Sequence, residues 1–331
     1  MSAPLTKKDF VSDQEVRWCP GCGDYAILAA IQKTMPDLGI PKEKIVFVSG
    51  IGCSSRFPYY MNTYGFHTIH GRAPAIATGL AAARPDLSVW VITGDGDGLS
   101  IGGNHLIHAL RRNVNLNILL FNNQIYGLTK GQYSPTSTPG TRSKSTPYGS
   151  LDAPFSATSV ALGAGATFVA RTYDKDAKHM GEVFKRAYNH KGTSFVEIYQ
   201  NCIIFNDAVF EPTIGKENKA DNVVFLQQGE PLKFGKEKDK GIAIDAHMAP
   251  TLTDDIGSAI VHDEQNPSPG YAFFLSQLTT PNFPEPMGVF RDIEKPSYEL
   301  ELERQEKEIT EKLGKGDLKK LLNSGDTWEI K

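Results

Sequence analysis

The chain has 331 residues, a formal net charge of −3, and a composition that is 40% hydrophobic and 22% charged. This is the composition of an ordinary globular protein, and its weak negative charge gives no reason to expect binding to nucleic acid or to an anionic membrane surface. The first ten residues contain no apolar core of a secretory signal, and no apolar run is long enough to cross a bilayer. We therefore expect a cytoplasmic protein, in which cysteine thiols stay reduced.

Predicted helices and strands alternate through the first two hundred residues. Helices are expected where apolar side chains gather at helical spacing, at 24–35, 74–84, 103–112 and 178–190. Strands are expected at short apolar runs, at 44–50, 89–93, 116–121, 167–170 and 195–199. This alternation is typical of a doubly wound α/β fold with a mostly parallel sheet, which we expect to occupy residues 1–210.

Two segments depart from this alternation. Residues 134–150 are mostly Ser, Thr, Pro and Gly, which make up 14 of the 17 residues, so they form either a flexible linker or a long active-site loop. After residue 210 the alternation fades, and residues 211–331 are expected to form a polar C-terminal extension that packs on a partner subunit. Within it, the charged stretch 299–322 is expected to form one or two solvated helices.

The four cysteines are placed where they can meet. Cys19 and Cys22 lie in the sequence WCPGCGD, just before the first predicted helix. Cys53 follows the first predicted strand and Cys202 follows the last, so both are expected at the carboxyl edge of the sheet. Four cysteines suit a [4Fe–4S] cluster or a tetrahedral zinc site, although structural zinc sites usually use two short ligand pairs. A redox-active pair at Cys19 and Cys22, or four unrelated cysteines, are also compatible with the spacing.

Polar residues follow two further strands at the same edge. The sequence TGDGDG, with Asp95, ends the strand 89–93, and the sequence NNQIYG, with Asn123, follows the strand 116–121. Glycine amides at a helix start favour a diphosphate, but two aspartates would repel it unless a divalent cation lay between them. Asp95 and Asn123 are therefore candidate ligands of Mg²⁺. The alternative is a pair of ordinary turns rich in Gly and Asn.

These motifs resemble a known family. WCPGCG, GIGCSSR, HGRA, GDGDG, NNQIYGLTKGQ and the last cysteine occur in the order seen in the β subunits of 2-oxoacid:ferredoxin oxidoreductases, and most resemble the 2-oxoglutarate enzymes. The resemblance covers residues 18–202 and implies a thiamine diphosphate-binding fold. It also implies two sets of metal ligands: Asp95, Asn123 and the Ile125 carbonyl for Mg²⁺, and Cys19, Cys22, Cys53 and Cys202 for a [4Fe–4S] cluster.

The same resemblance implies which residues contact the thiamine cofactor. They lie in the loops after the strands and at helix starts: Ile51, Gly52, Ser54, His70, Gly71, Arg72, Gly94, Gly96, Asp97, Gly127 and Leu128. For Asp97 the residue pattern favours a helix cap over a contact with the cofactor. For His70 the alternative is a polar side chain satisfied at the start of a helix.

The resemblance further implies a reaction and its partners. Such an enzyme converts 2-oxoglutarate and coenzyme A reversibly to succinyl-CoA and passes electrons one at a time through the cluster to ferredoxin. Nothing in this chain resembles the domain that binds the aminopyrimidine ring of thiamine. We therefore expect a separate α subunit, a dimer of αβ heterodimers, and an inactive isolated chain. The alternatives are a pyruvate or branched-chain 2-oxoacid enzyme, and a non-enzymatic, zinc-stabilised binding subunit.

Thr129 and Lys130 are the candidate catalytic residues, because they follow the expected Mg²⁺ ligands and should face the reacting centre. Pyruvate-using members tend to have Asn-Thr-Gly in this neighbourhood, where this chain has Leu128, Thr129 and Lys130. A lysine can pair with the second carboxylate of 2-oxoglutarate, which favours that substrate. The alternative is an exposed lysine at the mouth of the loop.

Overall fold

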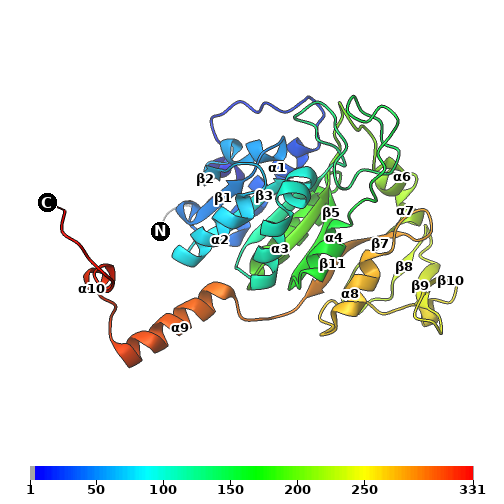
Figure 1. Cartoon of the computed structure of the whole chain (residues 1–331). Helices are drawn as coiled ribbons and strands as arrows, with labels where there is room; N and C mark the ends of the chain where they lie inside the picture. The colour runs from blue at the N-terminus through cyan, green and yellow to red at the C-terminus, as the bar shows by residue number, and fades with distance from the viewer. Residues whose placement is uncertain (1–3, 331) are drawn as a thin grey trace.

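The computed structural model describes residues 4–330 and contains one eight-stranded sheet in the order β2-β1-β3-β4-β6-β5-β11-β7 (Figure 1). The strands are β1 (Ile45–Ser49), β2 (Tyr64–His67), β3 (Ser88–Gly94), β4 (Asn117–Asn122), β5 (Phe168–Tyr173), β6 (Ser194–Tyr199), β7 (Val223–Phe225) and β11 (Glu285–Asp292). The first six in the sheet order are parallel, whereas β11 runs antiparallel to β5 and parallel to β7. The expected doubly wound, mostly parallel sheet is confirmed.

Helices cover both faces of this sheet. On one face lie α2 (Ala73–Ala83), α3 (Gly103–Arg112), α4 (Ala157–Gly163) and α8 (Pro269–Ser276), and on the other lie α1 (Asp24–Thr34) and α5 (Ala177–Asn189). Successive strand residues point to opposite faces, so Val46 and Val48 join the first cluster while Ile45 and Phe47 join the second. Because both faces are covered, the central strands can be apolar along most of their length.

The helices and strands expected in the first two hundred residues are present, and most of their ends agree within a residue or two. Larger differences occur only in strand length, where β5 continues to Tyr173. The charged C-terminal stretch forms α9 (Tyr298–Leu313) and α10 (Leu318–Leu322), as expected. Short helices α6 (Glu211–Ile214) and α7 (Lys219–Asn222) follow β6.

Three strands of the sheet were not expected from the sequence. The clearest case is β11, which carries Pro286 and Gly288, residues that are typical of turns and edges rather than of a central strand. It is nevertheless almost entirely buried between β5 and β7, with an irregularity between Val289 and Arg291. Pairing with β5 and β7, and not the residue pattern of β11 itself, therefore determines its extended conformation. The sheet thus continues beyond residue 210.

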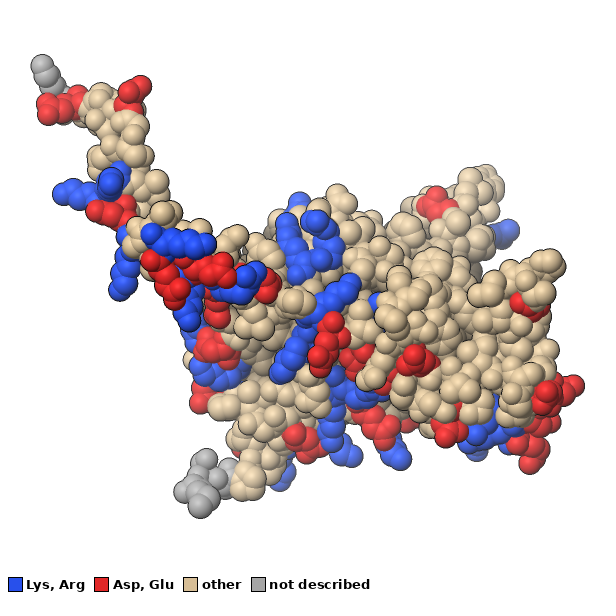
Figure 2. All heavy atoms as spheres, turned by 90° about the horizontal axis from the view of Figure 1, so that it is seen from below, with Lys and Arg blue, Asp and Glu red and all other residues tan. Residues whose placement is uncertain are grey.

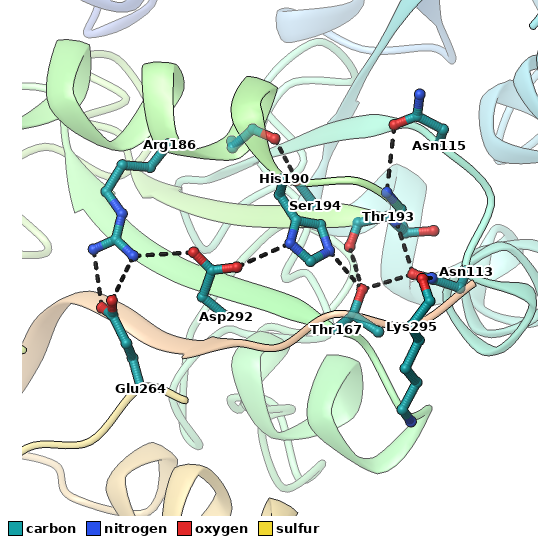
Figure 3. Close-up of polar contacts among 12 residues, drawn as sticks. Asn113, Asn115, Thr167, Arg186, His190, Thr193, Ser194, Glu264, Asp292 and Lys295 are labelled. Carbon is teal, nitrogen blue, oxygen red and sulfur yellow. Dashed lines mark hydrogen bonds and ion pairs between the residues drawn. The ribbon is translucent and has the colours of Figure 1, made fainter. Parts of the chain in front are cut away.

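A polar network holds β11 to the sheet at the edge where the parallel strands begin (Figure 3). Arg186 of α5 donates two hydrogen bonds to Glu264, at 2.9 and 2.7 Å, and one to Asp292 at the end of β11, at 3.1 Å. Asp292 also contacts Nδ1 of His190 at 2.9 Å, and Nε2 of His190 lies 2.8 Å from the hydroxyl of Thr167. These contacts join the C-terminal part of the chain to the first two hundred residues.

The C-terminal part also contains a small sheet and an arm. The strands β8 (Lys233–Phe234), β9 (Lys240–Ile244) and β10 (Pro250–Thr253) form an antiparallel sheet. The helices α9 and α10 extend away from the body of the molecule (Figure 1), and acidic and basic side chains are interspersed along the arm (Figure 2). Among residues 4–330, no helix combines the length and the apolar character that a membrane span requires.

Candidate active site

The loops that follow β1, β3 and β4 meet around a cavity of about 80 Å³. They converge because parallel strands end at the same edge of the sheet. Of the residues predicted from the sequence to contact the cofactor or Mg²⁺, the lining includes Ile51, Gly52, Ser54, His70, Gly94, Asp95, Gly96, Asp97, Asn123, Ile125, Gly127 and Leu128. Thr129 and Cys53 line it as well. Gly52 has φ of 134°, a conformation that favours glycine, and it leaves the backbone open to a ligand.

Asp95 lies buried at the end of β3, and its carboxylate accepts hydrogen bonds from Ser134 and Thr136 at 2.5 and 2.6 Å. Burial raises the pKa of Asp95 to about 6, although the two hydroxyls oppose the rise. A buried carboxylate with this cost of ionisation would be stabilised by a divalent cation. The donor set of the pocket therefore fits Mg²⁺. The loop 134–150 acts as part of the site and not as a linker.

Asn123 and Ile125 lie in the turn after β4, beside Asp95 in the same cavity. The Asn123 side chain donates to Gln200 at 2.8 Å, and its oxygen accepts from the Ile125 amide at 3.1 Å. Between them, Gln124 adopts φ of 54°, which lets the turn reverse within a single residue. The turn is thus fixed at both ends, and it places Asn123 and Ile125 in the lining of the cavity.

Asp97 does not cap the helical turn that follows it, so the helix cap favoured from the sequence is wrong. Its buried carboxylate accepts hydrogen bonds from the amides of Ile51 and Gly71, at 3.1 and 2.7 Å, and from Thr93 at 2.6 Å. It also contacts Nδ1 of His70. Asp97 therefore joins the loops after β1, β2 and β3, and its oxygens are already used within the protein.

Gly71 and Arg72 are not among the residues that line this cavity. Gly71 is held by Asp97 and lies against the backbone of Gly102. Arg72 immediately precedes α2, and its guanidinium contacts the ring of His105 in α3. These two residues therefore lie outside the lining of the pocket, although His70, which precedes them, is part of it.

A second cavity, of about 210 Å³, is lined by all four cysteines and adjoins the first. Trp18 donates a hydrogen bond to the carbonyl of Cys53 at 2.7 Å, which fixes the WCPGCGD segment against the loop after β1. The Gly23 amide donates to the Asn201 carbonyl at 3.1 Å, which brings the same segment to Cys202. These two hydrogen bonds, one on each side of the CxxC pair, thus bring together cysteines that are far apart in sequence.

Two thiols in this cavity, those of Cys22 and Cys53, have raised pKa values and so favour their protonated form. Burial raises the pKa of Cys53 to about 12 and raises that of Cys22 further, and the nearby Asp24 and the other cysteines add to both shifts. Gln200 donates to the sulfur of Cys22 at 3.2 Å. Metal ions bind thiolates, so an iron centre would offset the cost of ionising these groups. The donor set therefore fits a [4Fe–4S] cluster.

The spacing of the sulfurs bears on the zinc alternative. A single tetrahedral zinc needs sulfurs about 3.8 Å apart. Within residues 4–330, no three His, Cys, Asp or Glu side chains are close enough to share one metal ion. Gly127 adjoins two of the thiols, since a Cβ there would be 3.6 Å from the sulfur of Cys53 and 3.5 Å from that of Cys202. The cysteines surround a cavity instead of converging on a point.

Lys130 lines the cysteine cavity and not the first one. It shares that wall with the exposed Arg17 and the half-buried Arg56, so the charged lining groups that reach solvent are basic. The neighbouring Thr129 faces the first cavity. The two candidate catalytic residues therefore lie on different sides of the boundary between the cavities.

Several residues of the site were missed by sequence reasoning: Trp18, Asn122, Ser134, Thr136, Glu197 and Gln200. Trp18, Ser134, Thr136 and Gln200 contact predicted residues directly. Asn122 and Glu197 act through Thr136. A usable signal existed only for Ser134 and Thr136, which lie in the hydroxyl-rich loop that was expected to be either a linker or part of the site.

The doubly wound α/β fold is that of the thiamine pyrophosphate enzymes. The family model for the C-terminal TPP binding domain of thiamine pyrophosphate enzymes matches residues 50–198. The 2-oxoglutarate oxidoreductase subunit KorB of Mycobacterium tuberculosis is 55% identical over 99% of this chain and 89% of its own length. The 2-oxoacid:ferredoxin oxidoreductase 1 subunit beta of Aeropyrum pernix is 47% identical over 57% of this chain and 60% of its own.

A solved structure agrees with these relatives. The 2-oxoglutarate:ferredoxin oxidoreductase of Magnetococcus marinus, with 2-oxoglutarate, coenzyme A and succinyl-CoA bound, has a chain that superimposes with a TM-score of 0.78 at 36% identity. The match covers 98% of this chain and 97% of that one. This chain belongs to the β subunits of the 2-oxoacid:ferredoxin oxidoreductases.

Proposed function

We propose that this chain is the subunit that carries thiamine diphosphate and a [4Fe–4S] cluster in a 2-oxoglutarate-oxidising enzyme. The enzyme converts 2-oxoglutarate and coenzyme A to succinyl-CoA, passes the electrons to ferredoxin, and can also run in reverse. The observation that carries the proposal is the wall that the two cavities share. Cys53, Asn123, Gly127, Leu128 and Gln200 line both cavities. Electron transfer from one site to the other requires such close placement.

In this proposal Asp95, Asn123 and the Ile125 carbonyl hold Mg²⁺ and, through it, the diphosphate. Thiamine diphosphate, when bound, supplies a nucleophilic carbon for the 2-oxo group of the substrate. The chain itself fixes the position of that chemistry: Asp97 ties together the loops that cradle the diphosphate. Leu128, which is half-exposed at the mouth of the first cavity, would exclude water once a partner subunit covers it.

Cys19, Cys22, Cys53 and Cys202 are the proposed ligands of the cluster. A cluster held by four thiolates carries negative charge, which the neighbouring Arg17, Arg56 and Lys130 would offset. Cys19 is exposed, so this side of the cluster would be accessible to an electron carrier such as ferredoxin.

The choice of 2-oxoglutarate is supported by the names of two full-length relatives, one of which was solved with this compound bound. Within the chain, Thr129 and Lys130 remain the candidate catalytic residues, with Lys130 as the partner for the distal carboxylate. Its placement beside the cysteines means that the substrate would approach along the boundary between the two cavities.

The partner in this proposal is an α subunit that supplies the aminopyrimidine site, and two αβ pairs associate further. The C-terminal part supports this arrangement, because the arm leaves apolar side chains such as Leu313 and Leu318 exposed, at 80% and 70%. Exposed apolar groups of this kind are typical of surfaces that bind another protein.

The decisive experiment is co-purification with the α subunit, followed by reduction of a dye with 2-oxoglutarate, pyruvate and a branched-chain 2-oxoacid, each with coenzyme A. We expect the fastest reduction with 2-oxoglutarate, and a brown complex with a broad visible absorption band. A colourless, zinc-loaded complex would instead support a binding subunit. Turnover by the isolated chain would contradict the need for a partner.

A further inference from the structure

The carboxylate of Asp95 is held from one side by the loop after β4. Ser134 and Thr136 both donate to its Oδ2, at 2.5 and 2.6 Å, and all three side chains are buried. No side chain among residues 4–330 donates to Oδ1. One oxygen is therefore fixed by the protein, and the other is the oxygen available to a cation in the pocket.

Thr136 is itself held in place by Asn122. Thr136 has a single hydroxyl hydrogen, which it shares between Oδ2 of Asp95 at 2.6 Å and Oδ1 of Asn122 at 2.9 Å in a three-centre hydrogen bond. Oδ1 of Asn122 also accepts from the Gln124 amide at 3.2 Å. The nitrogen of the Asn122 side chain donates to Glu197 at 2.7 Å. A flipped amide would bring two donors together at Gln124 and two acceptors together at Glu197, so the orientation of Asn122 is determined.

Glu197 is fixed by a buried ion pair. Arg171 donates to it at 2.7 Å and to Thr158 at 3.0 Å, and both charged side chains are at most 4% exposed. A buried ion pair is weak evidence for a role in stability, since apolar residues of the same volume are often as stabilising or more so. Its position offers a better explanation, because it orients the amide that holds Thr136.

We propose that Thr136 and Glu197 are positioning residues for Mg²⁺, and that the series Arg171, Glu197, Asn122 and Thr136 holds Oδ2 of Asp95 so that Oδ1 is presented to the ion. This inference rests on the proposed function, in which Asp95 ligates Mg²⁺. Mg²⁺ requires nearly ideal octahedral geometry, whereas Ca²⁺ accepts irregular sites. A loosened carboxylate should therefore lose Mg²⁺ far more than Ca²⁺, an effect that a general loss of stability would not produce.

The test compares Thr136→Val, which keeps the shape and removes the hydroxyl, with Thr136→Ser, which keeps the hydroxyl. Thr138→Val is the matched control, since Thr138 is exposed in the same loop and makes no contact with Asp95. Each variant is co-purified with the α subunit, stripped of cofactors, and titrated with Mg²⁺ or Ca²⁺ at saturating thiamine diphosphate by calorimetry. We expect Thr136→Val to raise the Kd for Mg²⁺ by about 10–100-fold. The Kd for Ca²⁺ should change by less than about threefold.

Thr136→Ser and Thr138→Val should keep the Kd for Mg²⁺ within about threefold of the unmodified protein. Glu197→Gln should raise the Kd for Mg²⁺, as Thr136→Val does. If Glu197→Gln fails to fold, the comparison of Thr136→Val with Thr136→Ser tests the inference. Equal weakening of Mg²⁺ and Ca²⁺, or a serine variant as weak as the valine variant, would overturn the inference. If the unmodified protein shows no Mg²⁺-dependent binding of thiamine diphosphate, the proposed function fails instead.

Discussion

At the scale of single residues, the least satisfied group in the site is the carboxyl of Asp24, the last residue of WCPGCGD. It is 1% exposed, and neither oxygen has a hydrogen-bond partner among residues 4–330. Burial, with a smaller contribution from the charge of Asp174, raises its pKa to about 7. The unfolded chain therefore releases this proton at lower pH than the folded chain does, so stability falls as the pH rises from about 4 to 7.

Asp24→Asn should remove this penalty in the metal-free, reduced chain. The gain in unfolding free energy relative to the unmodified chain should be small at pH 4, grow up to pH 7, and level off on the order of 4 kcal/mol. Urea unfolding at several pH values measures it. Asp13→Asn, at an exposed position, is the control and should show no such trend. A pH-independent difference for Asp24→Asn would contradict the assignment.

Lys130 is the residue on which the proposed substrate preference depends. Loss of one charge-assisted contact to a carboxylate costs about 1.5–3 kcal/mol, so Lys130→Ala should raise the KM for 2-oxoglutarate roughly 10–100-fold and leave the KM for pyruvate nearly unchanged. Steady-state dye reduction with both substrates tests this. Lys144→Ala, at an exposed lysine that lines neither cavity, should change neither value. Equal effects on both substrates would remove Lys130 from specificity and leave its role with the cysteines.

The residues that ligand chemistry requires could be predicted, whereas those that position them could not. Asp95 and Cys53 each follow a strand directly, so local order alone places them at the carboxyl edge. Thr136 reaches Asp95 from 41 positions away, and Glu197 reaches Asn122 from 75 positions away. Such pairings depend on how a loop folds back and on side-chain rotamers, and no local pattern encodes either.

At the scale of elements, the network around β11 shows how an unpredicted strand is secured. Asn113 uses its nitrogen to donate to the carbonyls of Lys295 and Pro296, so its oxygen accepts from the Thr167 hydroxyl at 2.6 Å. Because the Thr167 hydrogen is committed to Asn113, Nε2 of His190 must donate to Thr167. The Thr167–His190–Asp292 series therefore lacks the proton arrangement of a hydrolytic triad, and Thr167 is inaccessible to substrate. These three residues instead hold the end of β11 against β5 and α5.

Asp292→Asn tests whether the contacts of Asp292 with His190 and Arg186 stabilise the fold. Burial alone would raise the pKa of Asp292, but its hydrogen bonds and charge interactions with His190 and Arg186 outweigh burial and lower it. The resulting stability is present at neutral pH and is lost as the pH falls below about 4. The variant should lower the free energy of unfolding at pH 7 by about 1–3 kcal/mol, and the difference should shrink in acid. Asp254→Asn, at an exposed position, should be neutral. A full effect that persists at pH 3 would argue against the ion pairs as its cause.

At the scale of the whole molecule, the arm is the part that the chain alone does not explain. Its start is anchored, because the buried Glu299 accepts a hydrogen bond from the Asn115 amide at 3.2 Å. Farther along, Leu313, Leu318, Leu321 and Leu322 are 69–80% exposed. Burial of each leucine contributes about 1.5–3 kcal/mol, so the four together could supply a large share of the free energy of an interface.

Truncation after Arg304 should separate folding from assembly, since it keeps the anchored first turns of α9 and removes the exposed leucines. We expect the shortened chain to unfold within about 2 °C of the full chain, because every described residue that it loses, 305–330, is exposed. Co-expressed with the α subunit, it should elute as smaller species in size-exclusion chromatography with light scattering. Substitution of the four leucines by serine in the full-length chain should reproduce the loss of assembly. That result would show that assembly depends on apolar contacts and not on the length of the arm. A truncated chain that still assembles with the α subunit into the same particle as the full chain would show that the arm binds something else.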